Sequence, residues 1–180
     1  MRVIRTPGDG EKNLKFALKN LDGKIGKTGW FSSAKYENGM QVAEVAVTQE
    51  YGDPGKNIPP RPFMRPTIAE QKAKWLDIVE RKSIDVVKGK ATAHDVMESV
   101  ALQAAGDVRK TITSIQTPPL KDSTIYARAS KRASFSNLKT PEARERKLAE
   151  LKQNPTFIKP LIDSGLLLNS CNGIVEDKIK

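Results

Sequence analysis

The stretch from Pro59 to Pro66 constrains the fold more than any other part of the chain, because four prolines stand within eight positions. Each proline fixes the backbone angle φ and lacks an amide hydrogen, so the stretch fits neither a helix interior nor a central strand. Phe63 and Met64 within it are apolar and favour burial, while Arg61 is charged. A stiff loop with apolar and arginine side chains is suited to docking onto another surface.

The composition indicates one domain with a basic surface. The 180 residues, 38% of them hydrophobic, fit a single domain spanning 1–180, with its core at about 9–120 and 160–180. The formal charge of +10 favours contact with a polyanion or an acidic protein, although a merely soluble basic protein carries such a charge too. Cys171 is the one cysteine, so no internal disulfide is expected, which fits assembly in a cytoplasm. No apolar run approaches the roughly 20 residues of a membrane span, so we predict no membrane partner.

Hydrophobic periodicity predicts an α+β fold, in which an antiparallel sheet packs against two long helices. The two long helices are expected to start at Pro66 and at Thr92 or Ala93, with Asp95 in the first turn of the second. The other predicted elements are a helix over Asp9–Leu21, a hairpin over 24–48 with strands at 24–31 and 40–48, a turn at Glu37-Asn38-Gly39, and a last strand over 171–179.

The segment from Lys121 to Lys159 differs from the rest, since it holds ten basic and four acidic residues and few apolar ones. Such a segment buries little area by itself and is expected to order only on assembly. We predict an extended or loosely structured basic insertion at about 121–159, with a charged helix near Pro141–Lys152.

The sequence predicts no catalytic, cofactor-binding or metal-binding residue. His94 is the single histidine, and a metal site would need further ligands at a recognisable spacing around it. A catalytic pair of Cys171 and His94 is the one enzymatic alternative, and no residue is positioned in the sequence to orient it. Asp163 and Asp122 are interpreted as helix N-caps.

Three segments resemble one family when they are taken in order. The first comprises Val47–Gly52 and Ile58–Ile68, the second Thr117–Leu120 with Ser123–Ile125, and the third Lys159–Leu167. They resemble the neck and tail-completion proteins of long-tailed bacteriophages. Those proteins carry an apolar strand ending in Glu-aromatic-Gly, then Pro-x-Arg-Pro-Phe-apolar-Arg-Pro, and later Pro-Leu-apolar-Asp-Thr-Gly-x-Leu. Here Ser164 replaces the threonine, and 121–159 is longer than the short link typical of the family.

The resemblance implies a virion structural protein that is not an enzyme and needs no cofactor. Such proteins form a ring at the head–tail junction, hexameric or built on a twelve-fold connector, after assembly in the host cytoplasm. The implied partners are copies of the chain itself, neighbouring connector or tail proteins, and genomic DNA that passes non-specifically through the lumen. Neck, tail-completion and tail-terminator roles share this local pattern.

Two groups of residues are the candidate contacts. The docking candidates lie in and beside the proline-rich loop: Glu50, Tyr51, Ile58, Pro60, Arg61, Pro62, Phe63, Met64 and Arg65. Alternatively, Phe63 and Met64 only pin this loop onto the core of their own subunit. The candidates for DNA phosphate are Lys131, Arg132, Arg144, Arg146 and Lys147. A solvated face or an acidic neighbouring ring accounts equally well for these cations, and a nucleic-acid-binding module that uses 121–159 is the alternative function.

Overall fold

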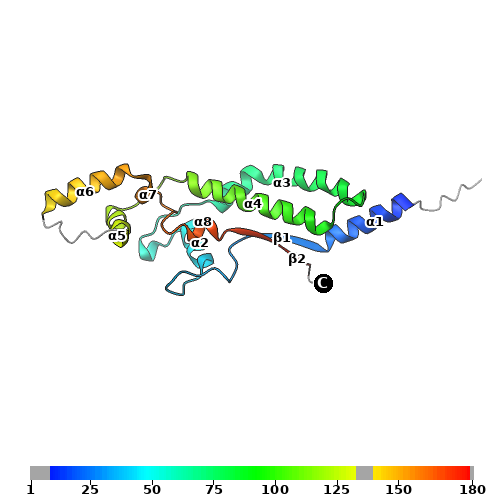
Figure 1. The fold of residues 1–180 in the computed structure, drawn as a ribbon, viewed down its shortest axis with the longest axis horizontal. Coiled ribbons are helices and arrows are strands. Elements are labelled where there is room, and N and C mark those ends of the chain that lie inside the picture. The colour runs from blue at the N-terminus through cyan, green and yellow to red at the C-terminus, as the bar shows by residue number, and fades with distance from the viewer. Residues whose placement is uncertain (1–8, 133–139, 179–180) are drawn as a thin grey trace, which may run out of the picture. The chain divides into compact units, whose positions relative to one another are not determined.

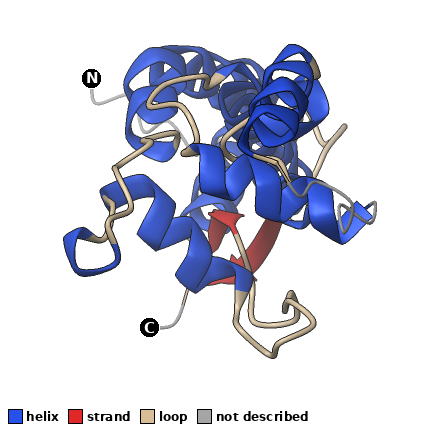
Figure 2. Ribbon diagram, turned by 90° about the vertical axis from the view of Figure 1, so that its left-hand side faces the viewer, coloured by secondary structure: helices blue, strands red, loops and turns tan. Residues whose placement is uncertain are grey.

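The computed structural model describes residues 9–132 and 140–178, which form many helices and one two-stranded antiparallel sheet (Figures 1 and 2). The predicted α+β class is confirmed. The elements in chain order are α1 (Asp9–Asp22), β1 (Lys24–Gly29), α2 (Val42–Tyr51), the 3-10 turn η1 (Pro54–Lys56), α3 (Met64–Val87), α4 (Ala93–Ser114), α5 (Asp122–Arg132), α6 (Pro141–Gln153), α7 (Pro155–Ile158), α8 (Leu166–Asn169) and β2 (Asn172–Asp177). Among the described helices none is long and apolar enough to cross a membrane.

The chain divides into two compact units. The first comprises Met1–Gly29, Thr67–Asp107 and Cys171–Lys180, and the second comprises Trp30–Pro66 and Val108–Ser170. Helices α3 and α4 contribute residues to both. That the whole chain folds as one domain stays a prediction.

In the first unit the sheet joins the two ends of the chain. β1 and β2 pair antiparallel, with Lys24 opposite Asp177 and Gly29 opposite Asn172. One face of the sheet lies against α4, where the Thr28 hydroxyl donates to the carbonyl oxygen of Ala101 at 2.9 Å. The last strand predicted at 171–179 is confirmed by β2. The predicted strand at 24–31 is confirmed over β1, but its partner is β2 and not residues 40–48.

The predicted strand over 40–48 is wrong, because these residues enter helix α2. Val42, Ala46 and Glu50 recur every four residues and are all buried, so the helical spacing decides the conformation over the strand preference of the valines. The predicted turn before it is present: the Gly39 amide donates to the Tyr36 carbonyl oxygen at 2.9 Å. Both long helices are confirmed, and the second starts at Ala93 with reciprocal hydrogen bonds between Thr92 and Asp95.

The predicted extended insertion at 121–159 is corrected over 121–132 and 140–159, since α5, α6 and α7 fold against one another in the second unit. The part of that prediction at 133–139 lies outside the described residues. Ile125, Ala129 and Leu151 form a buried cluster, and the partly buried side chains around it are Leu120, Tyr126, Leu148 and Phe157. The few apolar residues of this basic segment thus form one core because three helices each contribute some of them. An extended chain could not bring these residues together. The charged helix predicted near Pro141–Lys152 is confirmed as α6, whose first turn is capped by the Thr140 hydroxyl.

Candidate docking site around the proline-rich loop

The loop between α2 and α3 folds back tightly on itself. The backbones of Asp53 and Ile58 exchange two hydrogen bonds of 2.9 Å each, which close the tip of the loop. Gly52 has φ 77°, and a β-carbon there would lie 2.9 Å from the Ile58 carbonyl oxygen. Glycine is therefore required at this position both by the backbone angle and by the close approach of the loop.

Glu50 anchors the other end of this loop. The residue is only 4% exposed, and one carboxylate oxygen accepts the backbone N–H groups of Phe63 at 2.6 Å and Met64 at 2.9 Å. The second oxygen accepts the backbone N–H of Arg65 at 3.2 Å and its Nε at 2.9 Å. Burial raises the pKa of Glu50, but the hydrogen bonds from Met64, Phe63 and Arg65 outweigh it and hold the pKa below its usual value. Glu50 thus acts as an ionised cap on the first turn of α3.

Arg61 joins the loop to the segment that follows α4. The guanidinium is buried and donates from Nε to the Pro118 carbonyl oxygen at 2.8 Å and from Nη2 to that of Pro119 at 3.2 Å. Its Nη1 donates to the side-chain oxygen of Gln49 at 3.4 Å. Burial lowers the pKa of Arg61. The planar fork of an arginine matches two adjacent carbonyl oxygens, which a lysine ammonium group cannot do with the same geometry.

We expect Arg61→Lys to lower the free energy of unfolding by about 2 kcal/mol, because at least one buried carbonyl oxygen loses its donor. Arg81→Lys is the matched control, since the Arg81 side chain is exposed and pairs with Asp77 one helical turn away. The control is expected to change stability by less than about 0.5 kcal/mol. Chemical denaturation followed by circular dichroism measures both. Equal effects of the two substitutions would contradict the buried role of Arg61.

Phe63 connects the loop, through Trp30, to the segment Lys159–Leu167. It is completely buried, and its ring meets that of Trp30 edge to face, with centroids 5.5 Å apart. The indole nitrogen of Trp30 donates to the carbonyl oxygen of Leu167 at 2.7 Å. Phe63 therefore pins the loop onto its own core, which was the alternative interpretation of this residue.

Arg128 was missed by the sequence analysis. It lies in α5 and is 8% exposed, and it donates to the carbonyl oxygens of Lys159 at 2.6 Å, Pro160 at 2.8 Å and Ile162 at 3.1 Å. Its position three residues after the buried Ile125 puts it on the apolar face of the helix, and this spacing was the available signal.

The two predicted aspartate caps are corrected. Asp163 is no helix N-cap, because Gly165 precedes α8, and the Asp163 carboxylate lies 3.9 Å from Nε of Arg128. Asp122 is the first residue within α5 and pairs with Lys152 at 2.8 Å.

The docking candidates divide into internal and outward residues. Glu50, Arg61 and Phe63 are buried in their own chain, so their side chains hold the loop and are not offered to a second surface. Tyr51, Pro60, Pro62 and Arg65 are exposed, whereas Ile58 and Met64 are partly buried. The Arg65 guanidinium stacks over the Tyr51 ring at 4.7 Å. That these outward residues contact another chain stays a prediction.

The basic candidates do not form one stripe. Lys131, Arg144 and Arg146 are exposed, whereas Lys147 is partly buried and bonds Glu150 at 2.8 Å. Arg144 and Arg146 are two residues apart on α6, which separates them by about 200° around the helix. The side chain of Arg132 lies outside the described residues.

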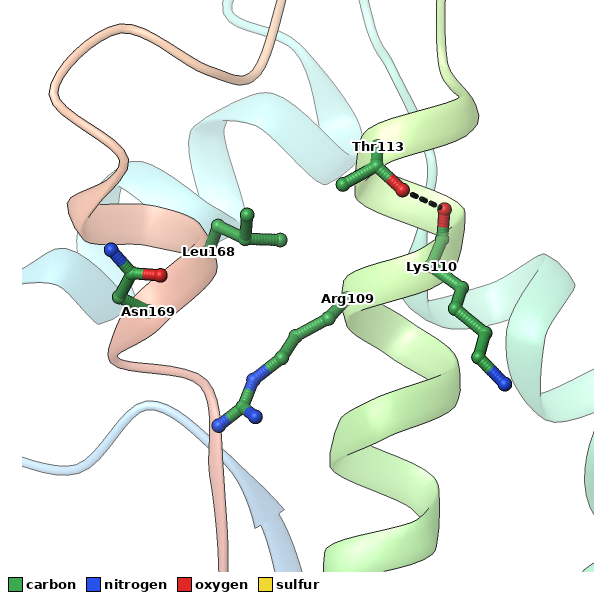
Figure 3. A pocket seen from close by; sticks show the side chains of 5 residues that line it. All are labelled: Arg109, Lys110, Thr113, Leu168 and Asn169. Atoms are coloured by element: carbon green, nitrogen blue, oxygen red, sulfur yellow. Dashed lines mark hydrogen bonds between the residues drawn. The ribbon is translucent and has the colours of Figure 1, made fainter.

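Two of the hollows among the described residues of the second unit lie near α8. The smaller, of about 290 Å³, is lined by Arg109, Lys110, Thr113, Leu168 and Asn169. Figure 3 shows that Arg109 reaches from α4 toward the Asn169 side of the hollow, whereas Lys110 points away from it. The larger, of about 920 Å³, lies among the 35–49 and 160–169 segments and α5. Charged, polar and apolar side chains line both hollows.

Comparison with other proteins finds no relative for this chain: no family model, curated protein or solved structure matches it. In residues 9–132 and 140–178, no three His, Cys, Asp or Glu side chains are grouped to hold a metal ion. His94 is exposed on α4 and Cys171 is completely buried. The function is therefore inferred from the residues and the geometry of the chain itself.

Proposed function

We propose that this chain is a structural protein of a long-tailed bacteriophage particle, and that it forms a ring which joins or completes the tail at the head–tail junction. One observation carries the proposal: the three segments that resemble this family converge within the second unit. Arg61 of the first segment bonds Pro118 and Pro119 of the second, and Phe63 of the first reaches Leu167 of the third through Trp30.

The chemistry of the shared residues supports a structural role. Glu50 and Arg61 in the first segment, and Arg128 shortly after the second, are charged and buried, and each is engaged by main-chain hydrogen-bonding groups. A catalytic acid, base or nucleophile needs access to a substrate, which these buried groups do not have. Glu50 and Arg61 fix the shape of the proline-rich loop, and Arg128 fixes the segment at 159–162.

The outward face of the loop is suited to docking. Tyr51 and Arg65 are of the two residue types that, with tryptophan, dominate binding energy at protein interfaces. The internal bonds of the loop already restrict it, so little conformational entropy is lost when it binds a neighbouring ring. DNA that passes through such a ring would meet exposed cations such as Arg146 through phosphate contacts alone.

The experiment is to locate the chain in phage particles. A tagged copy should appear on the particle axis at the head–tail junction in averaged electron micrographs. Particles made without the chain should accumulate as separate heads and tails. A Tyr51→Ala, Arg65→Ala variant should fold yet give fewer joined particles, whereas the exposed control Lys72→Ala should join normally. Absence of the chain from joined particles would refute the proposal.

A nucleic-acid-binding module is the second candidate, favoured by the exposed cations Lys131, Arg144 and Arg146. Tight binding of the isolated chain to short duplex DNA, weakening steeply with salt, would support it over the structural role. Because Arg144 and Arg146 diverge around α6, we expect weak binding.

A further inference from the structure

The sheet of the first unit has two open edges. β1 and β2 are paired only with each other among the described strands, so each strand has an outer edge without a partner strand. Helix α4 supports one face of this two-stranded sheet but pairs with neither edge, and an unpaired edge presents a row of N–H and C=O groups to any strand that approaches.

The phase of the ladder tells which backbone groups face outward. The Lys178 amide donates to the Gly23 carbonyl oxygen at 3.0 Å, so this pair is hydrogen-bonded, and hydrogen-bonded pairs alternate along an antiparallel ladder. The backbone groups that point away from the partner strand are therefore those of Lys24, Gly26 and Thr28 on β1 and of Gly173, Val175 and Asp177 on β2. Each edge offers donors and acceptors at every second residue.

The charges of the two edges are opposite. β1 carries Lys24 and Lys27, whereas β2 carries Glu176 and Asp177. Within one chain they already pair across the ladder, at 2.5 Å for each pair. Two β1 edges or two β2 edges would bring like charges opposite each other, but a β1 edge beside a β2 edge repeats the attraction found inside the sheet.

We propose that the β1 edge of one copy pairs with the β2 edge of the next, so that the sheet continues from copy to copy. The partner is a second copy of this chain, because it supplies an antiparallel strand of equal length and opposite charge. Contacts of this head-to-tail kind close into a ring when the rotation between copies closes. That the copies close into a ring rests on the function proposed above, whereas the pairing of the edges is inferred from the sheet itself.

Helix α1 leads directly into β1 and extends past the Lys24 end of the strand (Figure 1). Its large side chains Leu14, Phe16 and Leu18 are 42%, 68% and 56% exposed. A neighbour that pairs with β1 would come close to this helix and could cover these side chains, which would strengthen a contact that six-residue strands alone make weak.

The test uses charge reversal with complementation. The double variant Lys24→Glu, Lys27→Glu and the double variant Glu176→Lys, Asp177→Lys each give a chain whose two edges have the same sign. Each is expected to stay monomeric in sedimentation velocity at concentrations where the wild type associates. An equimolar mixture of the two should associate again, because each edge of one variant then meets an opposite edge of the other. Both variants are expected to fold, because each like-charged exposed pair costs only about 1 kcal/mol. Circular dichroism checks this.

Hydrogen exchange on the wild type is the second measurement. The outward amide of Val175 should exchange fast in dilute protein and slowly in the associated state, whereas the inward amide of Ile174 should be slow in both. A monomeric wild type, association of either variant on its own, or a mixture that stays monomeric would overturn the inference. So would a slow Val175 amide in the monomer, which would mean that the chain covers its own edge.

The two proposals can fail separately. Loss of edge pairing in a protein still found at the head–tail junction leaves the proposed function standing. Edge pairing in a protein absent from particles refutes the proposed function alone.

Discussion

Glu50→Ala is expected to lower the free energy of unfolding by about 3 kcal/mol, because three backbone N–H groups at the start of α3 lose their acceptor together. These are the amides of Phe63, Met64 and Arg65, which one carboxylate now satisfies. Urea denaturation followed by circular dichroism measures the loss. Glu44→Ala is the control, since Glu44 is exposed on the same helix. Its effect should stay below about 0.5 kcal/mol, and a comparable loss in both variants would contradict the capping role.

The same site should make stability depend on pH. The pKa of folded Glu50 is lowered by hydrogen bonds that outweigh the effect of burial. The unfolded chain therefore binds more protons, and the stabilisation is complete above the ordinary glutamate pKa of about 4.3 and is lost as the pH falls through the folded pKa. Glu50→Gln should be less stable than the wild type at neutral pH, and the difference should shrink in acid. A difference that is constant with pH would show that the charge of Glu50 does not matter.

Gly173→Ala is the second substitution with a large expected effect, about 3 kcal/mol of destabilisation. A β-carbon at this position would lie 2.4 Å from the carbonyl carbon of Ala101 and 2.7 Å from the amide nitrogen of Leu102. Both atoms belong to the backbone of α4, which cannot move aside as a flexible side chain can. The sheet would have to lift from the helix, and the hydrogen bond between Thr28 and Ala101 would be strained.

Gly106→Ala is the matched control for this prediction. Gly106 lies inside α4, and a β-carbon there meets nothing within 4 Å. Alanine should stabilise the helix by about 0.5–1 kcal/mol, because glycine loses more backbone entropy on folding. Thermal unfolding of both variants measures the opposite signs. If Gly173→Ala were as stable as the wild type, the tight packing of β2 on α4 would be contradicted.

The accuracy of the sequence-based predictions followed the range of the interactions involved. Helix α4 was predicted from its apolar stripe and its Thr92 start, because both are contacts between residues three or four positions apart. The 40–48 segment was predicted wrongly as a strand, since β-branched valines suit a strand locally. The buried face of α2 decided otherwise. In the 121–159 segment, apolar residues too sparse for one helix became a core only when three helices shared them.

The prolines predicted the position of the docking loop, but nothing in the sequence predicted which of its side chains point inward. Arg61 and Phe63 are of residue types that are common at protein interfaces, and only their burial shows that they face inward. Arg128 has no signal as a ligand of main-chain carbonyls except its place on an apolar helix face.

The amino-acid order alone determined the turn at Gly39, the starts of α4 and α6, and the stiffness of the proline-rich loop, because proline, glycine and capping residues act on their immediate neighbours. The tertiary structure decided that β1 pairs with β2 at the other end of the chain, and which carbonyl oxygens Arg61 and Arg128 bind. These contacts depend on residues distant in sequence, whose approach is set by the packing of whole helices and leaves no periodic pattern along the chain.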